Sequence, residues 1–133
     1  MADDLAQLSD DELLRYARQI LLDGWDMDAQ LRLKSARVVI IGAGGLGCPA
    51  SETLVRAGVG YVHLIDDDAI EASNLQRQTL FLPEDIGQSK ALTAAAMLAR
   101  INPLIEAYGT VARLDEDNAY ELLNLASGKP DLL

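Results

Sequence analysis

Six residues, Gly42-Ala43-Gly44-Gly45-Leu46-Gly47, have the types and spacing that bind a phosphate group through the backbone. They follow residues 38–41 (VVII), a β-branched apolar run typical of a strand buried on both faces of a parallel sheet. The glycines permit a tight turn and bring backbone N–H groups close to a phosphate at the start of the next helix. The pattern predicts a nucleotide-binding strand–loop–helix unit.

Three consecutive carboxylates, Asp66, Asp67 and Asp68, follow the next predicted strand, residues 61–65. An acid at this position accepts hydrogen bonds from ribose hydroxyls in dinucleotide-binding folds, and we expect this role for Asp66. Crowded carboxylates need a compensating cation or ligand, so one neighbour can hold magnesium through its oxygens. We expect Asp67 to belong to a solvated acidic turn. Up to this point, a dehydrogenase fits equally well.

Two cations distinguish this sequence from a simple dinucleotide site. Arg77 lies in a polar stretch without an obvious acidic partner, and a guanidinium binds phosphate oxygens in a bidentate fork. Lys90 falls in the first turn of a predicted helix, where its charge opposes the helix dipole at a cost of roughly 0.3–1 kcal/mol. The alternatives are an exposed surface arginine and a lysine that bends into solvent. With the carboxylates, these cations favour a polyphosphate with a metal, ATP rather than NAD.

The predicted elements place these residues along a doubly wound sheet. Ser9 and Glu12 form a capping box that starts a helix ending at Gly24, and an amphipathic piece follows at residues 28–34. The predicted apolar stripe of the first helix consists of Leu13, Leu14, Ala17, Ile20 and Leu21. Further on we predict a helix from Pro49 to the cap Gly58, a helix at residues 90–101 with Ser89 as its cap, a strand at 104–111 and a helix at 117–126.

The last three residues, Asp131-Leu132-Leu133, read as the opening of a fourth parallel strand. The fold class that follows is α/β: a Rossmann-like, doubly wound, mainly parallel sheet with helices on both faces, truncated at the fourth strand. We expect an N-terminal helical segment at residues 1–35 and an ATP-binding domain at 36–133 that is incomplete at its C-terminus. We therefore expect the chain to be a fragment of a longer protein.

Composition excludes several classes of function. The net charge of −10 argues against a nucleic-acid partner, because such binding depends on clustered Lys and Arg. No apolar run approaches the roughly 20 residues that span a bilayer, so no membrane partner is expected. The acidic N-terminus is unlike a secretory signal, and a single cysteine, Cys48, rules out an internal disulfide. We expect a cytoplasmic protein.

Together these residues resemble the MoeB/ThiF/HesA adenylyltransferase family, relatives of the ubiquitin-activating enzymes. The matching stretches are residues 15–20, 42–47, 57–60, 66–68, 73–78 and 87–90, in the family's order through nearly the whole chain. The stretch Ser73-Asn74-Leu75-Gln76-Arg77-Gln78 is the most specific of them.

The resemblance implies a reaction in which ATP and the C-terminal Gly-Gly carboxylate of a small ubiquitin-like sulphur-carrier protein give an acyl-adenylate and pyrophosphate. The ATP-binding residues that it implies are Gly42, Gly44, Gly45, Gly47, Asp66, Asp68, Ser73, Asn74, Leu75, Gln76, Arg77 and Lys90. Arg18, Arg77 and Lys90 are the implied catalytic residues, and Arg18 resembles an arginine that reaches into the partner's active site across a homodimer.

This sequence departs from the family pattern in two respects. The family's magnesium-binding aspartate segment on the fourth strand and its two zinc-binding Cys-x-x-Cys pairs are absent, so Mg²⁺ and structural Zn²⁺ ligands are expected beyond Leu133. Alone, this chain should be weak or inactive as a catalyst. Activation of molybdopterin synthase is the first choice of pathway, with the thiamine branch a close second.

Two other classes of function remain open at the level of sequence. An NAD-dependent oxidoreductase would use the same glycine loop, bind NADH more tightly than ATP and give Arg77 and Lys90 no role in affinity. A non-catalytic nucleotide-binding or interaction domain would dock a partner independently of Asp66.

Overall fold

The computed structural model describes residues 7–123 and 129–133, which contain a parallel sheet in the order β1-β2-β3. The strands are β1 (Arg37–Ile41), β2 (Tyr61–Asp66) and β3 (Glu106–Val111). On the free edge of β1, Leu132 forms a parallel bridge with Val38, and its carbonyl accepts a 3.0 Å hydrogen bond from the Val39 N–H. The chain therefore extends the sheet on both sides of β1, as in a doubly wound fold, and the predicted Rossmann-like class is confirmed.

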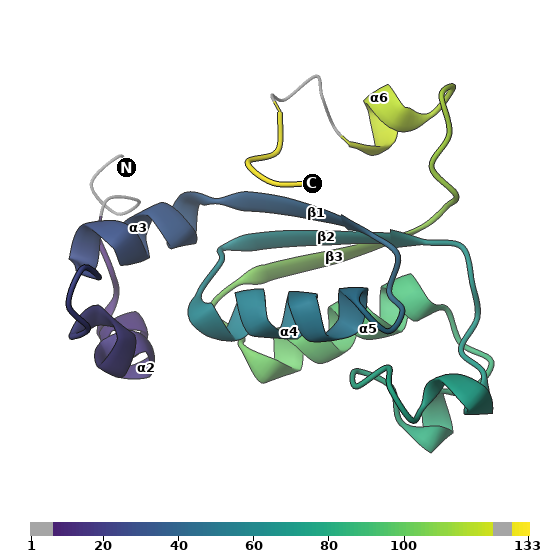
Figure 1. Ribbon diagram of the computed structural model, residues 1–133, viewed down its shortest axis with the longest axis horizontal. Coiled ribbons are helices and arrows are strands. Elements are labelled where there is room, and N and C mark those ends of the chain that lie inside the picture. Colours follow the sequence, from purple (N-terminus) through teal and green to yellow (C-terminus); the bar gives the residue numbers. More distant parts are fainter. Residues whose placement is uncertain (1–6, 124–128) are drawn as a thin grey trace.

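Helices lie on both faces of this sheet (Figure 1). One face is covered by α4 (Gly47–Ala57) and α5 (Lys90–Ile101), which enclose the main core around the buried residues Val62, Leu64 and Leu98. The other face carries the short α6 (Ala119–Leu122), where Leu123 packs against Val39 and Ile65. Both faces of β1 and β2 contribute buried side chains, which explains why these strands are continuous apolar runs.

Two N-terminal helices, α2 (Asp10–Ile20) and α3 (Met27–Ser35), pack at the amino ends of the strands. The Tyr16 hydroxyl accepts a 2.8 Å hydrogen bond from Asn102, which caps α5, and that same amide group donates to the Val55 carbonyl at 2.8 Å. Asn102 and the C-terminal end of α4 each lie just before a strand begins, so α2 is attached to the edge of the sheet opposite to the glycine loop. Figure 1 shows α2 and α3 at one end of the molecule and the segment that follows β2 at the other.

The predicted apolar stripe of the first helix is only partly right: Leu13, Ala17 and Ile20 are half-buried, but Leu14 and Leu21 are not. The helix buries Glu12 and Tyr16, whereas Leu14 and Leu21 are 80% and 82% exposed. Glu12 completes the predicted capping box with Ser9 and also accepts a 2.8 Å hydrogen bond from Lys34 of α3. Glu12 and Tyr16, rather than leucines, are therefore the side chains that α2 buries against the rest of the domain. Burial of these polar groups is possible because each has a hydrogen-bond partner.

Several predicted boundaries also shift. The first helix ends at Ile20 rather than Gly24, and the third strand begins at Glu106 rather than 104. The helix predicted at 117–126 is observed as α6, and residues 124–126 lie outside the described residues. The helix of residues 90–101 and its cap Ser89, by contrast, are confirmed, as is the left-handed cap Gly58 (φ +105°) after α4.

Two single-turn helices, η1 (Ala72–Asn74) and η2 (Pro83–Asp85), lie in the connection between β2 and α5. Within the described part of the chain, no helix is long and apolar enough to cross a membrane.

Candidate nucleotide-binding site

The loop between β1 and α4 is shaped to receive an anion. Gly42 has a φ of +98° and donates to the Ile65 carbonyl at 2.8 Å, which ties the start of the loop to β2. A Cβ atom on Gly47 would collide with the Gly42 carbonyl oxygen, so only glycine allows this turn. The N-terminus of α4 has no side-chain cap at Leu46 and no acid in its first turn. The Cys48 N–H already donates to the Gly44 carbonyl at 3.0 Å and Pro49 has no N–H, so the backbone N–H groups that a phosphate can use are those of residues 44–47. They lie at the positive end of the helix dipole.

Asp66 connects this loop to the end of β2. One of its carboxylate oxygens accepts a hydrogen bond from the Ala43 N–H at 2.8 Å, and the other accepts from the Asp68 N–H at 2.7 Å. These two bonds fix the carboxylate at the carboxyl edge of the sheet. Each oxygen retains a lone pair, so Asp66 can still accept from the two hydroxyls of a ribose.

Two neighbouring side chains of the segment after η1 lie over two neighbouring glycines of the loop. A Cβ atom built on Gly45 would lie 3.4 Å from Arg77 Cδ, and one on Gly44 would lie 3.8 Å from Gln78 Nε2. Arg77 is exposed and donates from Nη1 to the Ser73 carbonyl at 3.0 Å, whereas Gln78 is buried. The segment after η1 and the glycine loop thus line the same site, and Gly44 and Gly45 lie where the two approach each other.

Lys90 lies at the first position of α5, and its side chain is 9% exposed. Its Nζ is 3.9 Å from the Asp68 carboxylate, a separation beyond hydrogen-bonding distance, while its backbone N–H donates to the Asp68 carbonyl at 3.1 Å. The Asp68 side chain itself is 69% exposed. A buried ammonium group at a helix N-terminus with only a loose carboxylate contact is suited to a second anion.

The remaining residues of the polar stretch have different environments. Ser73 and Gln76 are exposed, and Leu75 packs against the core. Asn74 is buried, and its side-chain oxygen accepts a 2.9 Å hydrogen bond from the Glu71 N–H. Asn74 and Leu75 therefore hold the segment in place, and Ser73, Gln76 and Arg77 reach solvent beside the loop.

Arg18 is not part of this assembly. It is exposed on α2, at the amino edge of the sheet, and the five residues of β1 alone separate the two edges by about 15 Å. Within one chain, the structure does not bring Arg18 to the glycine loop.

The carboxyl edge also contains a hollow of about 250 Å³, lined by Gly42, by residues 65–68 and by residues 112–114. Arg113 lines this hollow, and sequence reasoning missed it. The one feature of the sequence that could have indicated Arg113 is its position two residues beyond the end of a predicted strand. The Asp66–Asp68 carboxylates lie within 4.8 Å of one another, and among the described residues this is the one group of three or more acids, histidines or cysteines that could hold a metal ion.

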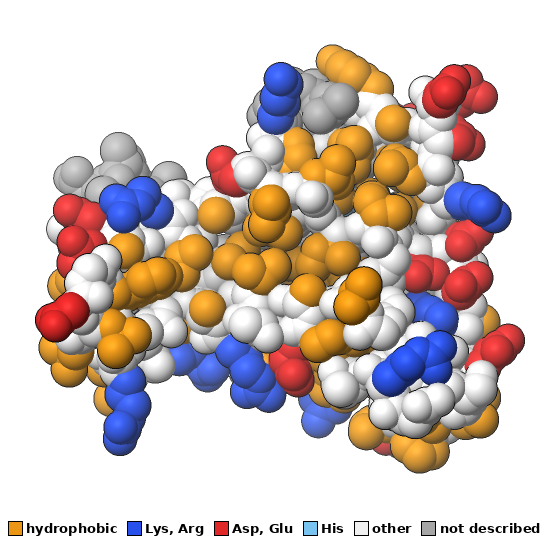
Figure 2. All heavy atoms as spheres, in the orientation of Figure 1, with side chains coloured by type: hydrophobic (Ala, Val, Ile, Leu, Met, Phe, Trp, Pro, Cys, Tyr) orange, Lys and Arg blue, Asp and Glu red, His pale blue; other side chains and the backbone are white. Residues whose placement is uncertain are grey.

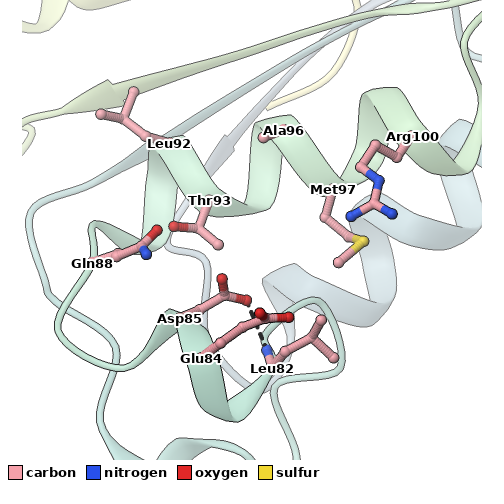
Figure 3. Close-up of a pocket in the computed structure, with 9 residues that line it drawn as sticks. All are labelled: Leu82, Glu84, Asp85, Gln88, Leu92, Thr93, Ala96, Met97 and Arg100. Atoms are coloured by element: carbon pink, nitrogen blue, oxygen red, sulfur yellow. Dashed lines mark hydrogen bonds between the residues drawn. The ribbon is translucent and has the colours of Figure 1, made fainter.

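Two further grooves lie outside the glycine-loop site. A groove of about 440 Å³ separates η2 from α5, with Glu84 and Asp85 on one wall and Met97 and Arg100 on the other (Figure 3). Hydrophobic side chains gather around β1 in Figure 2, where a second groove is lined by residues 38–41, by α4 and by Leu132 and Leu133.

Two titratable side chains are structural. Burial raises the pKa of the Cys48 thiol, which is fully enclosed and donates to the Ala43 carbonyl at 3.4 Å. Burial and the Arg37 charge lower the pKa of His63, which lies 2.7 Å from the Thr110 hydroxyl within the sheet. Both side chains therefore serve packing and hydrogen bonding within the domain.

The fold and the site define the class of protein: a Rossmann-like α/β domain with a glycine loop, an aspartate at the end of the second strand and two cations beside them. The profile of the ThiF family matches residues 16–133. The chain belongs to the ThiF family.

Relatives extend this comparison. The chain is 50% identical over 119 residues to a molybdopterin-synthase adenylyltransferase of Salmonella typhimurium, covering 90% of this chain and 48% of the relative. It is 47% identical over 113 residues to a sulfur carrier protein adenylyltransferase of Thermus thermophilus, covering 85% of this chain and 42% of the relative. The chain thus spans about half the length of these curated relatives.

A solved structure supports the fold. The E. coli tRNA N6-threonylcarbamoyladenosine dehydratase TcdA in complex with ATP superposes with a TM-score of 0.82 at 27% identity, covering 92% of this chain and 49% of that one.

Proposed function

We propose that the protein containing this chain uses ATP to adenylate the C-terminal Gly-Gly carboxylate of a small ubiquitin-like sulphur-carrier protein. A carboxylate oxygen attacks the α-phosphorus of ATP, the bond from that phosphorus to the bridging oxygen breaks, and pyrophosphate leaves. A weak anionic nucleophile must approach an anionic centre, so positioning and charge neutralisation dominate the catalysis. The observation that carries the proposal is the position of Arg77 directly over the glycine loop.

The roles of the other residues follow from their positions. The glycine loop holds the phosphates through backbone N–H groups, and Asp66 binds the ribose. Arg77 and Lys90 neutralise the phosphates and the departing pyrophosphate, and Asn74 fixes the segment that carries Arg77.

The resemblance implies that the family's magnesium-binding aspartate lies beyond Leu133, and the carboxylates at this edge of the sheet also fit the chemistry of Mg²⁺. Asp68 and Asp67 present exposed carboxylate oxygens beside Asp66, and such hard oxygen ligands suit Mg²⁺. When bound, Mg²⁺ neutralises phosphate charge. The chain has a single cysteine, so structural Zn²⁺ on Cys-x-x-Cys pairs, which we also propose, requires residues other than these.

Arg18 acts across a homodimer. Its position at the opposite edge of the sheet from its own glycine loop supports this role, because Arg18 does not reach that loop within one chain. We also propose that the protein is cytoplasmic and that it activates molybdopterin synthase, with the thiamine branch a close second. Two relatives are named adenylyltransferases, one of them a sulfur carrier protein adenylyltransferase, and these names favour adenylation of a sulphur carrier over hydride transfer.

The test is direct detection of the adenylate. The intact protein is incubated with Mg-ATP and a carrier ending in Gly-Gly, and the carrier's mass and the released pyrophosphate are measured. An AMP adduct and stoichiometric pyrophosphate are expected. A carrier with an amidated C-terminus is the control, since it lacks the nucleophile. Equal pyrophosphate release from both carriers would contradict the proposal.

A further inference from the structure

Gln78 contains a buried polar atom that the fold leaves unsatisfied. The residue is 3% exposed, and its amide oxygen Oε1 is buried without a hydrogen-bond partner in the part of the chain that the structure describes. Its backbone is well held, with its N–H donating to the Asn74 carbonyl at 2.9 Å and its carbonyl accepting from the Phe81 N–H at 3.3 Å. The backbone of Gln78 is therefore fixed, whereas its buried amide oxygen makes no hydrogen bond with the described part of the chain.

The nitrogen of the same amide faces the glycine loop. Of the described atoms outside the glycine's immediate chain neighbours, Gln78 Nε2 is the one within 4 Å of a Cβ built on Gly44, at 3.8 Å. Gly44 thus leaves open the space in front of an N–H₂ donor. The neighbouring Arg77 stands in the same relation to Gly45.

At position 78, beside Gly44, an amide side chain suits a phosphate ligand better than a carboxylate or an apolar side chain does. Nε2 can donate to a phosphate oxygen without adding charge, whereas glutamate would repel the phosphate. Leucine would fill a similar volume and remove the unsatisfied oxygen, so packing alone does not favour glutamine. Residues that cost stability in this way are concentrated at functional sites.

We propose that Gln78 is a further nucleotide-binding residue, whose Nε2 donates a hydrogen bond to a phosphate oxygen held over Gly44. This inference rests on the proposed function, because it requires a nucleoside polyphosphate in the site. Gln78 and Arg77 then contact the phosphates side by side, one as a neutral donor and the other as a cation.

The experiment compares ATP with adenosine on Gln78→Leu, Gln78→Glu and the parent protein, all intact. Affinities are measured by titration calorimetry in the presence of Mg²⁺, and Tm is measured for each variant. Gln88→Leu, at an exposed glutamine of the same connection, is the matched control.

We expect Gln78→Leu to bind ATP about tenfold more weakly, to bind adenosine as the parent does and to have an equal or higher Tm. Gln78→Glu should lose more ATP affinity than Gln78→Leu, because it adds a negative charge. Gln88→Leu should leave ATP affinity unchanged.

Three results would overturn the inference: unchanged ATP affinity in Gln78→Leu, an equal loss for ATP and adenosine, or a lowered Tm, which would show a structural role. Failure of the parent protein to bind ATP would instead overturn the proposed function, and this inference with it.

Discussion

The Arg77 side chain lies against Gly45 of the phosphate loop, with Cδ 3.4 Å and Nε 3.5 Å from the position that a Cβ on Gly45 would occupy. A hydrogen bond of 3.0 Å from Nη1 to the Ser73 carbonyl holds the guanidinium beside the loop. A cation and the N-terminus of α4 therefore face the same space, which is the arrangement that a polyphosphate requires.

Removing this cation should weaken nucleotide binding without unfolding the protein. Arg77 is exposed, so Arg77→Ala should leave Tm nearly unchanged. It should raise the Kd for Mg-ATP roughly 10–100-fold, since hydrogen bonds to charged groups contribute about 1.5–3 kcal/mol. Titration calorimetry measures the Kd and a thermal unfolding scan measures the Tm, each against Arg56→Ala, an exposed arginine at the far end of α4. Equal affinities in the two variants would remove Arg77 from the site.

The loop glycines should separate into structural and binding positions. A methyl group on Gly47 meets the Gly42 carbonyl, which is backbone and cannot move aside, so Gly47→Ala should cost more than about 3 kcal/mol of unfolding free energy. A methyl group on Gly45 meets only the flexible Arg77 side chain at van der Waals distance. Gly45→Ala should therefore remain folded and lose ATP affinity. Urea unfolding and ATP titration of both variants check this, and similar stabilities would contradict it.

Glu12 should make the stability of the protein depend on pH. Burial alone would raise its pKa, but the hydrogen bonds from Lys34 and Ser9 outweigh burial and lower the pKa below its ordinary value of 4.5. A carboxylate with a lowered pKa in the folded state stabilises the protein above the unfolded pKa, and this contribution is lost as the pH falls through the folded pKa.

Glu12→Gln should accordingly lower the unfolding free energy by about 1–2 kcal/mol at pH 7, and the difference from the parent should shrink below pH 4.5. Urea unfolding at pH 7 and pH 4 measures it. Asp11→Asn, at an exposed acid on the same helix, is the control. A difference that is constant across this pH range would contradict the explanation.

Arg18 should act on the partner's site. Arg18→Ala and Arg77→Ala should each abolish most adenylation alone. A hybrid dimer of the two variants has one site in which both arginines are intact. A statistical mixture should therefore recover about a quarter of the parent activity. No recovery, with subunit exchange verified, would place Arg18 outside the partner's site.

The sequence predicted the sheet and the residues at its carboxyl edge, because the signals are local. The run of residues 38–41 followed by glycines determines a strand and a turn. Two local hydrogen bonds delimit α5: the Ser89 hydroxyl accepts from the Leu92 N–H, and the Asn102 N–H donates to the Leu98 carbonyl. What it missed depends on contacts between distant residues. The burial of Tyr16 depends on Asn102, 86 positions away, and the burial of Glu12 depends on Lys34.

The site shows the same division. The residue types of 73–78 predicted hydrogen bonding to a ligand, but not which side chains turn inward. Asn74 and Gln78 are buried, whereas Gln76 and Arg77 are exposed, and this alternation follows from the consecutive turns of the segment. Neither spacing nor composition reveals the unpaired oxygen of Gln78.

The central claim, a site for a nucleoside triphosphate at the glycine loop, is tested most directly by titrating the intact protein with Mg-ATP and with NADH. The account predicts saturable binding of Mg-ATP, weaker binding of NADH, and a loss of ATP affinity in both Arg77→Ala and Lys90→Ala. NADH binding tighter than ATP binding, with neither variant affected, would contradict the account and favour an oxidoreductase.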